Sequence, residues 1–196
     1  MAIASKRQKY IQEQLNESAE TKKNMFDACS GGIVKAVDAI IACYNKNGKV
    51  LLCGNGGSAA DSQHIATELV IRMMNPKRRA LAAIALTTDS SMLTAGGNDI
   101  GFENIFSRQI EGLGNAGDVL IAISTSGKSE NVNRAITEAK KKKMTVIGFL
   151  GKGGGTSKKM VDIPIIIPSN DTQRIQEGHI TVAHIICGLV EQEMFG

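Results

Sequence analysis

Five short apolar runs, each followed by a loop rich in Gly, Ser, Thr or Asn, constrain the fold of this chain more than any other feature. They predict buried strands over residues 49–53, 81–86, 119–123, 145–150 and 162–167. Helical periodicity between and after them predicts helices over residues 58–74, 90–113, 129–143, 154–160 and 172–194. Strands that are apolar on both faces and alternate with helices are typical of a parallel sheet covered on both sides. We therefore expect an α/β fold, a three-layer α/β/α domain with a five-stranded parallel sheet.

A helical extension precedes the first strand. Apolar side chains recur at three- and four-residue steps through the first 47 residues, and a break is expected at Gly31-Gly32. The extension is too apolar for a lone surface helix, so we expect it to pack against another subunit. The predicted organisation is a single domain over residues 1–196, with residues 1–47 as N-terminal helices in the oligomer and residues 48–196 as the α/β core.

Charge, hydropathy and the N-terminal sequence argue against a membrane-spanning or secreted protein and give no sign of nucleic-acid binding. The net charge of +4, from 23 basic and 19 acidic residues, does not by itself indicate nucleic-acid binding, and the longest apolar run, residues 80–86, falls far short of the roughly 20 residues of a membrane span. The N-terminus lacks the apolar core of a signal peptide, which predicts a cytoplasmic location. The cysteines form no CxxC pair and are expected to be reduced core residues; they are Cys29, Cys43, Cys53 and Cys187.

The loop over residues 124–129, Ser-Thr-Ser-Gly-Lys-Ser, carries the clearest binding signal. In open parallel sheets, ligands bind beyond the carboxyl ends of the strands, where this loop lies. Its hydroxyls and the first amides of the following helix can all point at one anion. A helix cap without a ligand would need only one hydroxyl, so the pattern favours phosphate. The GxxxxGK[ST] order is missing, which argues against nucleoside triphosphate hydrolysis.

A second glycine-rich loop, Gly54-Asn55-Gly56-Gly57-Ser58, also joins a strand to a helix. Its glycines let a ligand approach the backbone closely. The loop is not GxGxxG, and no acidic residue closes the following strand as a dinucleotide ribose would require. A nicotinamide cofactor is therefore not expected.

Two distant helices carry candidate metal ligands. His64 and Glu68 are four residues apart, which places them on one face of a helix, although such pairs are also common on surfaces. In the last helix, His184 lies in an apolar run and needs a partner, and Gln176 precedes it by about two turns. If the helices pass each other, these four side chains could surround one metal, for which zinc is the best match to N/O ligands. A satisfied core histidine is the alternative for His184, and His179, about 140° away around the helix, is expected at the surface.

Several motifs together resemble the phosphoheptose isomerases of the sugar isomerase (SIS) domain family, over nearly all 196 residues. They are Cys53-Gly54-Asn55-Gly56-Gly57-Ser58, Gln63-His64 with Glu68-Leu69, Gly97-Asn98-Asp99 followed by Phe102 and Ile105-Phe106-Ser107-Arg108, Gly117-Asp118-Val119-Leu120 with Ile123-Ser124-Thr125-Ser126-Gly127, and Arg174-Ile175-Gln176-Glu177. The resemblance implies interconversion of D-sedoheptulose 7-phosphate and D-glycero-D-manno-heptose 7-phosphate. It also implies one zinc ion per subunit, a homotetramer with active sites at subunit interfaces, and a supply of heptose for lipopolysaccharide or related surface glycans.

The resemblance also assigns site residues by position. It implies His64, Glu68, Gln176 and His184 as zinc ligands. The implied substrate-binding set is Asn55, Gly56, Gly57, Glu68, Asn98, Asp99, Ser124, Thr125, Ser126, Ser129 and Gln176. Moving a carbonyl between C2 and C1 through an enediol requires a base, an acid and stabilisation of an oxyanion. Glu68 is the candidate base, and His184 is the candidate carrier of the second proton.

Other functions are compatible with the expected fold. One branch of the SIS family, the replication-initiator-associating proteins, binds the initiator of chromosome replication and lacks some catalytic positions, whereas this chain retains Glu68 and His184 together. The other possibility is a different sugar-phosphate isomerase or a sugar-phosphate sensor domain. Sensors usually carry DNA-binding segments, and these 196 residues contain none.

Overall fold

A five-stranded parallel sheet forms the centre of the molecule. The computed structural model describes residues 2–196, with side chains from Ser5 onward, so Met1 of the predicted N-terminal helices lies outside the described residues. The strands are β1 (Val50–Gly54), β2 (Ala83–Ala85), β3 (Val119–Ser124), β4 (Thr145–Leu150) and β5 (Ile163–Ile166). Their order is β2-β1-β3-β4-β5, and all neighbours are parallel. The predicted five-stranded parallel sheet is confirmed.

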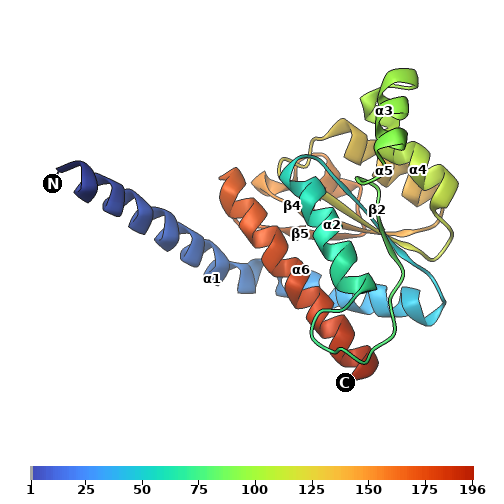
Figure 1. Cartoon of the computed structure of the whole chain (residues 1–196), viewed down its shortest axis with the longest axis horizontal. Helices are drawn as coiled ribbons and strands as arrows, with labels where there is room; N and C mark the ends of the chain where they lie inside the picture. Colours follow the sequence, from blue (N-terminus) through green and yellow to red (C-terminus); the bar gives the residue numbers. More distant parts are fainter. Residues whose placement is uncertain (1) are drawn as a thin grey trace.

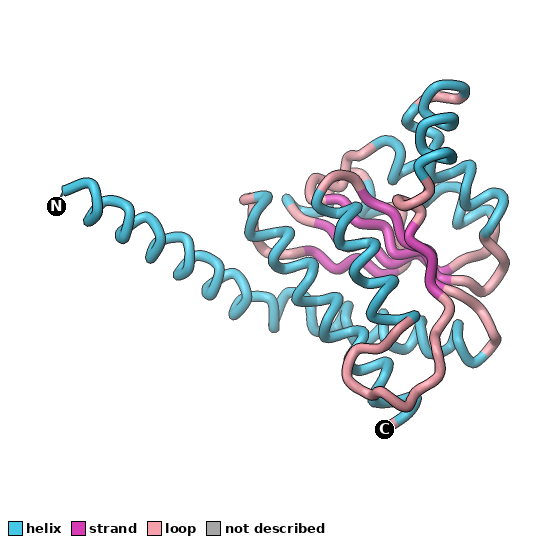
Figure 2. Tube along the Cα trace, in the orientation of Figure 1, coloured by secondary structure: helices cyan, strands magenta, loops and turns pink. Residues whose placement is uncertain are grey.

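Helices cover both faces of the sheet (Figures 1 and 2). They are α1 (Ala2–Asn45), α2 (Gly57–Val70), α3 (Ser90–Asp99), α4 (Ile105–Leu113), α5 (Glu130–Lys141) and α6 (Thr172–Phe195). One core cluster joins the sheet to α1, α2 and α6, and the other joins it to α4 and α5, with α3 at its margin. The predicted α/β/α layering is therefore confirmed. No helix in residues 2–196 combines the length and hydropathy needed to cross a membrane.

Alternation along the strands builds the two cores. In β1, Val50 and Leu52 face the cluster with α1 and α6, whereas Leu51 and Cys53 face the cluster with α5. Each of these four side chains is 0% exposed. Because both faces are covered, the strands read as continuous apolar runs. Burying one leucine of this kind contributes about 2 kcal/mol.

The helix α1 runs without interruption through Gly31 and Gly32, so the predicted break there is wrong. A Cβ atom on Gly32 would lie 3.0 Å from Ile165 Cγ1 and 3.1 Å from the Pro164 carbonyl oxygen. Gly32 therefore allows α1 to approach β5 closely. Beyond this contact, the N-terminal part of α1 projects away from the sheet (Figure 1).

Three predicted helices differ in extent from the observed ones. The stretch over residues 90–113 is divided into α3, a 3₁₀ turn over Phe102–Asn104, and α4, because Gly101 adopts a left-handed φ of 87°. The stretch over residues 58–74 ends as α2 at Val70. The expected helix at 154–160 is replaced by 3₁₀ turns over Lys152–Gly154 and Ser157–Lys159.

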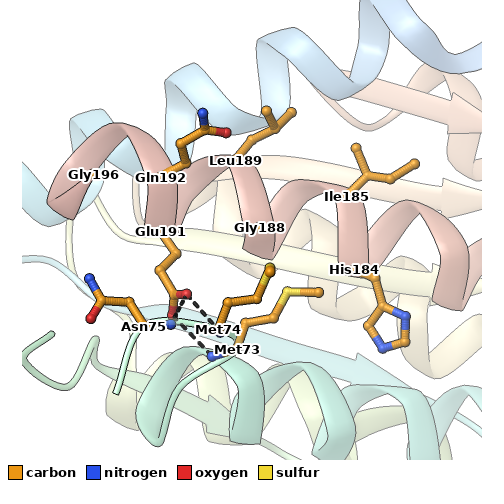
Figure 3. A pocket seen from close by; sticks show the side chains of 10 residues that line it. All are labelled: Met73, Met74, Asn75, His184, Ile185, Gly188, Leu189, Glu191, Gln192 and Gly196. Atoms are coloured by element: carbon orange, nitrogen blue, oxygen red, sulfur yellow. Dashed lines mark hydrogen bonds between the residues drawn. The ribbon is translucent and has the colours of Figure 1, made fainter. Parts of the chain in front are cut away.

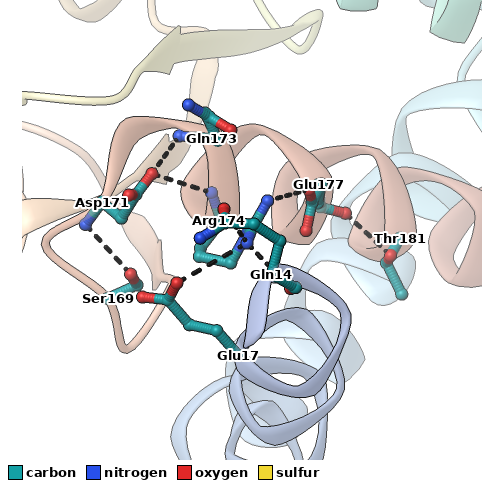
Figure 4. A network of polar contacts seen from close by, with 8 residues as sticks. All are labelled: Gln14, Glu17, Ser169, Asp171, Gln173, Arg174, Glu177 and Thr181. Atoms are coloured by element: carbon teal, nitrogen blue, oxygen red, sulfur yellow. Dashed lines mark hydrogen bonds and ion pairs between the residues drawn. The ribbon is translucent and has the colours of Figure 1, made fainter. Parts of the chain in front are cut away.

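The start of α6 is tied to α1 by a buried arginine (Figure 4). Asp171 caps α6 by accepting from the backbone N–H groups of Gln173 and Arg174 at 2.6 and 3.4 Å. The Arg174 guanidinium donates to the backbone and side-chain oxygens of Gln14 at 3.0 and 3.1 Å, and to Glu177 Oε1 at 2.6 Å. These bonds fix the end of α6 that carries Gln176.

Candidate metal centre and phosphate-binding loops

The two glycine- and serine-rich loops meet where the strand order reverses. The chain passes from β1 to β2 on one side of the sheet and from β3 to β4 on the other. Such a switch point opens a crevice beyond the carboxyl ends of the two central strands. The side-chain amides of Asn55 and Asn131 donate to each other at 2.9 and 2.8 Å, which joins the loop after β1 to the start of α5. The loops predicted to bind substrate are therefore neighbours.

Hydroxyl groups of the loop after β3 lie close together, and the side chain of the N-cap residue does not cap α5. Ser124 Oγ lies 3.1 Å from Ser129 Oγ and accepts from the backbone N–H of Gly127 at 3.1 Å. Ser129 is the N-cap residue of α5, but its side chain makes no cap hydrogen bond. Thr125 and Ser126 are half-buried in the same loop. Hydroxyls clustered at a helix N-terminus meet the requirements of an anion site.

Gly127 gives this loop its shape. Its φ of 61° is left-handed, and a Cβ atom there would lie 2.0 Å from the Gly154 carbonyl oxygen. Ser157 Oγ donates to the Gly127 carbonyl oxygen at 2.9 Å and pairs with Asn133 Oδ1 at 2.6 Å. The loop is thus packed against the turn after β4, and only glycine fits at its tightest point.

Three of the four predicted metal ligands come together from two helices. His64 Nε2 on α2 lies 3.2 Å from Glu68 Oε1, one turn further along. His184 Nε2 on α6 lies 3.3 Å from His64 Nε2, and the two rings are nearly perpendicular, with centroids 5.0 Å apart. The ligand atoms of all three residues lie within 4.8 Å of one another. The predicted meeting of α2 and α6 is therefore observed for these side chains.

The donor set suits a transition metal. Two imidazole nitrogens and a carboxylate oxygen are the ligands of many catalytic zinc sites, which keep a fourth position open. Zinc–nitrogen bonds of about 2.0 Å place neighbouring ligands of a tetrahedron about 3.3 Å apart, close to the two separations seen here. The His64 side chain is 44% exposed, so the centre is open on one side.

Gln176, the fourth predicted ligand, faces the first glycine-rich loop. Its side-chain amide fills the space beside Gly57, where an added Cβ atom would lie 2.4 Å from Gln176 Nε2. This contact places Gln176 at the start of α2, the helix that carries His64 and Glu68. A larger residue at position 57 would displace the Gln176 amide from this place.

His179 is buried, so its expected surface position is wrong. The ring is 1% exposed, its Nε2 lies 3.1 Å from the Leu150 carbonyl oxygen, and it packs against Phe149. Burial lowers the pKa of His179 to about 4, although the Leu150 hydrogen bond opposes this shift. It is a core histidine of α6 bonded through Nε2, and a core position was the alternative considered earlier for His184.

Asn98 and Asp99 lie outside this cluster in the single chain. Asp99 is the last residue of α3, and Asn98 Nδ2 donates to its Oδ1 at 2.7 Å. Both residues are exposed. Figure 1 shows α3 at the edge of the molecule, away from α6.

Sequence reasoning missed three acidic or basic residues around the centre. Asp61, one turn before His64, has a buried Oδ2 atom without a hydrogen-bond partner among the described residues, and burial raises its pKa while His64 opposes the shift. Glu191, about two turns after His184 on α6, forms a buried ion pair with Arg78. Glu191 lines a hollow of about 720 Å³ that reaches His184 (Figure 3). In the sequence Glu191 is followed by Gln192 and Glu193, so no local signal set it apart as a buried residue.

Comparisons with known proteins agree with the fold and with the motifs. Residues 13–151 match the SIS domain family. A phosphoheptose isomerase from Clostridium acetobutylicum is 51% identical over 189 residues, which are 95% of this chain and 96% of the relative. The structure of a phosphoheptose isomerase from Neisseria gonorrhoeae matches with a TM-score of 0.89 and 42% identity over 94% of this chain and 98% of that one. One from Francisella tularensis matches with a TM-score of 0.92 and 37% identity over 95% and 98%.

Proposed function

The chain belongs to the SIS domain family, among its phosphoheptose isomerases, and from this premise we propose how its own residues carry out the reaction. It is an aldose–ketose isomerase that interconverts D-sedoheptulose 7-phosphate and D-glycero-D-manno-heptose 7-phosphate, for heptose biosynthesis. The observation that carries the mechanism is the meeting of His64, Glu68 and His184 from two distant helices.

We propose that the serine-rich loop binds the phosphate and directs the other end of the sugar to the centre. Ser124, Thr125, Ser126 and Ser129 supply hydroxyls, and the start of α5 supplies a positive dipole. The first loop, with Asn55, Gly56 and Gly57, is joined to the start of α5 through the Asn55–Asn131 hydrogen bonds and would contact the sugar hydroxyls. Asn98 and Asp99 remain in the proposed substrate set, and we propose that they contact the substrate in the site of a neighbouring subunit.

Glu68 is the proposed base. Its Oε1 faces His64, which leaves Oε2 to take a proton from C1 of the ketose. The electron pair of that C–H bond forms the C1–C2 double bond of an enediol, and the C2 oxygen gains a proton. Return of a proton to C2, with loss of the proton on the C1 oxygen, gives the aldehyde. His184 is the proposed carrier of protons between the two oxygens.

Zinc is the proposed metal, one ion per chain, held by His64, Glu68, Gln176 and His184. When bound, it would polarise the sugar oxygens and stabilise negative charge that develops on them. The support is the N/O donor set and the spacing of its three converging members. Gln176 would complete the set from the start of α6.

We further propose a cytoplasmic homotetramer with its active sites at subunit interfaces, in which residues 1–47 pack between subunits and residues 48–196 form the α/β core. Large apolar side chains along α1 support the assembly, because Leu15 and Phe26 are 65% and 76% exposed. All four cysteines are buried with free thiols, which suits a reducing compartment. The heptose product would supply lipopolysaccharide or a related surface glycan.

A coupled assay with D-sedoheptulose 7-phosphate tests the activity, with and without prior removal of metal by a chelator. Metal-replete protein should form the aldose, and metal-free protein should regain activity when zinc is restored. No turnover by metal-replete protein would contradict the enzymatic function. Full activity after verified metal removal would contradict the zinc proposal alone.

Histidines of the same helix provide a matched pair of variants. His184→Gln should abolish stoichiometric zinc binding and activity, because it removes one of the converging ligands. His179→Gln should retain both, because His179 lies in the core and bonds a backbone carbonyl. Equal zinc content in the two variants would remove His184 from the proposed ligand set.

A further inference from the structure

A buried carboxylate near the end of α6 holds the loop that follows α2. Glu191 is 4% exposed, and its two oxygens accept four hydrogen bonds. The backbone N–H groups of Met73, Met74 and Asn75 donate at 3.0, 2.7 and 2.6 Å, and Arg78 Nε donates at 2.6 Å. Figure 3 shows the three backbone bonds converging on Glu191. Burial alone would raise the pKa of Glu191, but these donors outweigh it and lower the pKa to about 2.

Arg78 connects this carboxylate to the turn of α2 that carries Glu68. Its Nη2 donates to the Glu68 backbone oxygen at 2.5 Å, and its side chain is 1% exposed. α2 ends at Val70, so the Glu68 carbonyl is one of the last four, which lack partners within the helix. A cation there is also favoured by the helix dipole. Arg78 therefore supplies a hydrogen bond and a positive charge at the end of α2.

α2 and α6 are therefore connected at two positions along their length. At the first position, His184 Nε2 of α6 lies 3.3 Å from His64 Nε2 of α2. Glu191 follows His184 by seven residues, or about two turns, and lies on the same side of α6. At the second position, Arg78 donates both to Glu191 of α6 and to the backbone oxygen of Glu68 in α2.

We infer that Glu191 and Arg78, together the Glu191–Arg78 clamp, are positioning residues for the metal centre. The clamp holds the last turn of α2, and with it Glu68, at the distance from His184 that metal binding requires. Neither side chain is free to bind the ion, because both Glu191 oxygens are occupied and the guanidinium is cationic. This inference rests on the metal centre proposed above.

A second ion pair, in which the carboxylate is buried and the lysine is partly exposed, provides a control. Asp118 is 2% exposed and accepts from the backbone N–H groups of Lys49 and Asn115 at 2.9 and 2.8 Å, and from Lys49 Nζ at 2.6 Å. It immediately precedes β3, at the end of the sheet opposite the candidate site. Loss of this pair should destabilise the fold without disturbing the centre.

The experiment compares Arg78→Met, Arg78→Lys and Asp118→Asn with the unaltered protein. Zinc affinity is measured by competition with a chromophoric chelator, and amide hydrogen exchange of Leu69 and Val70 is measured in metal-free protein. We expect Arg78→Met to weaken zinc binding about 10- to 100-fold and to accelerate exchange in this turn. Asp118→Asn should leave both close to those of the unaltered protein. Arg78→Lys should recover part of the loss, because a lysine keeps the charge but not the guanidinium's second contact.

Equal losses in Arg78→Met and Asp118→Asn would overturn the inference, as would an Arg78→Met protein with unchanged zinc affinity and exchange. If Arg78→Met does not fold, Glu191→Gln replaces it under the same criteria. If the unaltered protein binds no zinc, the proposed metal centre fails, whereas the exchange comparison still decides the clamp. Faster exchange confined to the clamp variant supports it, and unchanged exchange contradicts it.

Discussion

Glu68 has two proposed roles, and a conservative change tests the more demanding one. Glu68→Gln keeps the size of the side chain and an oxygen ligand but removes the basic carboxylate. We expect turnover of sedoheptulose 7-phosphate to fall at least about 100-fold, as for loss of a general base. The variant is compared at measured zinc occupancy, with Glu111→Gln at an exposed surface ion pair as control. A fall of less than about tenfold would assign the base to another residue.

His179 makes stability depend on pH. Its pKa is about 4 in the folded chain against an ordinary 6.5, because burial disfavours the charged ring. Between these values the unfolded chain binds more protons, so the unfolding free energy should fall as the pH drops from 6.5 to 4. The full effect is about 3 kcal/mol. Protonation would also leave Nδ1–H without an acceptor, since Nδ1 has no partner among the described residues.

Denaturant unfolding across this pH range checks the expectation with His179→Gln. Glutamine can still donate to the Leu150 carbonyl but does not titrate, so the variant should lose that part of the pH dependence. An identical pH dependence in both proteins would show that His179 is not its source.

His179 also shows where sequence reasoning is limited at the level of residues. Helical spacing correctly separates His179 from His184, but it does not say which sides of α6 are covered. α6 packs against both α1 and the sheet, so a position opposite the metal centre is buried rather than exposed. The converging ligands were predictable because His184 lies in an apolar run where it needs a partner, and because the motifs resemble those of the SIS family. The Glu191–Arg78 pair joins residues 113 apart, and nothing in the local sequence indicates that contact.

At the level of elements, the shape of the loop after β3 depends on one glycine. Gly127→Ala would place a methyl group 2.0 Å from the Gly154 carbonyl oxygen at a left-handed φ, so the loop must shift. Losing a charged hydrogen bond to phosphate costs about 1.5–3 kcal/mol, and we expect KM for the sugar phosphate to rise about tenfold or more.

Gly112→Ala is the matched control for this change. Gly112 lies in α4 with nothing within 4 Å of an added Cβ atom, so alanine should be neutral or stabilise the helix by about 0.5–1 kcal/mol. Steady-state kinetics of both variants give the KM values for the sugar phosphate that are to be compared. The same KM in the two variants would mean that the loop does not bind the phosphate.

The elements themselves were predictable to differing degrees, for physical reasons. The strands follow from apolar runs that only a doubly covered sheet can bury. Glycines were harder to interpret, because the same residue type ends α3 through the φ of Gly101 but lies within α1 at Gly32, where it permits close packing on β5. Only the tertiary contact distinguishes the two cases.

At the level of the whole molecule, the projecting α1 predicts assembly. Its apolar side chains, including Phe26, would be costly to leave in water over this length of helix. We expect the unaltered protein to sediment as a tetramer, and Phe26→Glu to shift it toward smaller species. Lys23→Glu, at an exposed lysine of the same helix, should not. A stable monomer of unaltered protein with full activity would contradict interfacial active sites.

We propose that α2 and α6 hold one metal ion beside a phosphate-binding loop. An anomalous-difference map from crystals of zinc-loaded protein, collected on both sides of the zinc absorption edge, would locate that ion. We expect one strong peak per chain within bonding distance of His64, Glu68 and His184. A map with no peak among these side chains, or with its peak elsewhere on the protein, would contradict it.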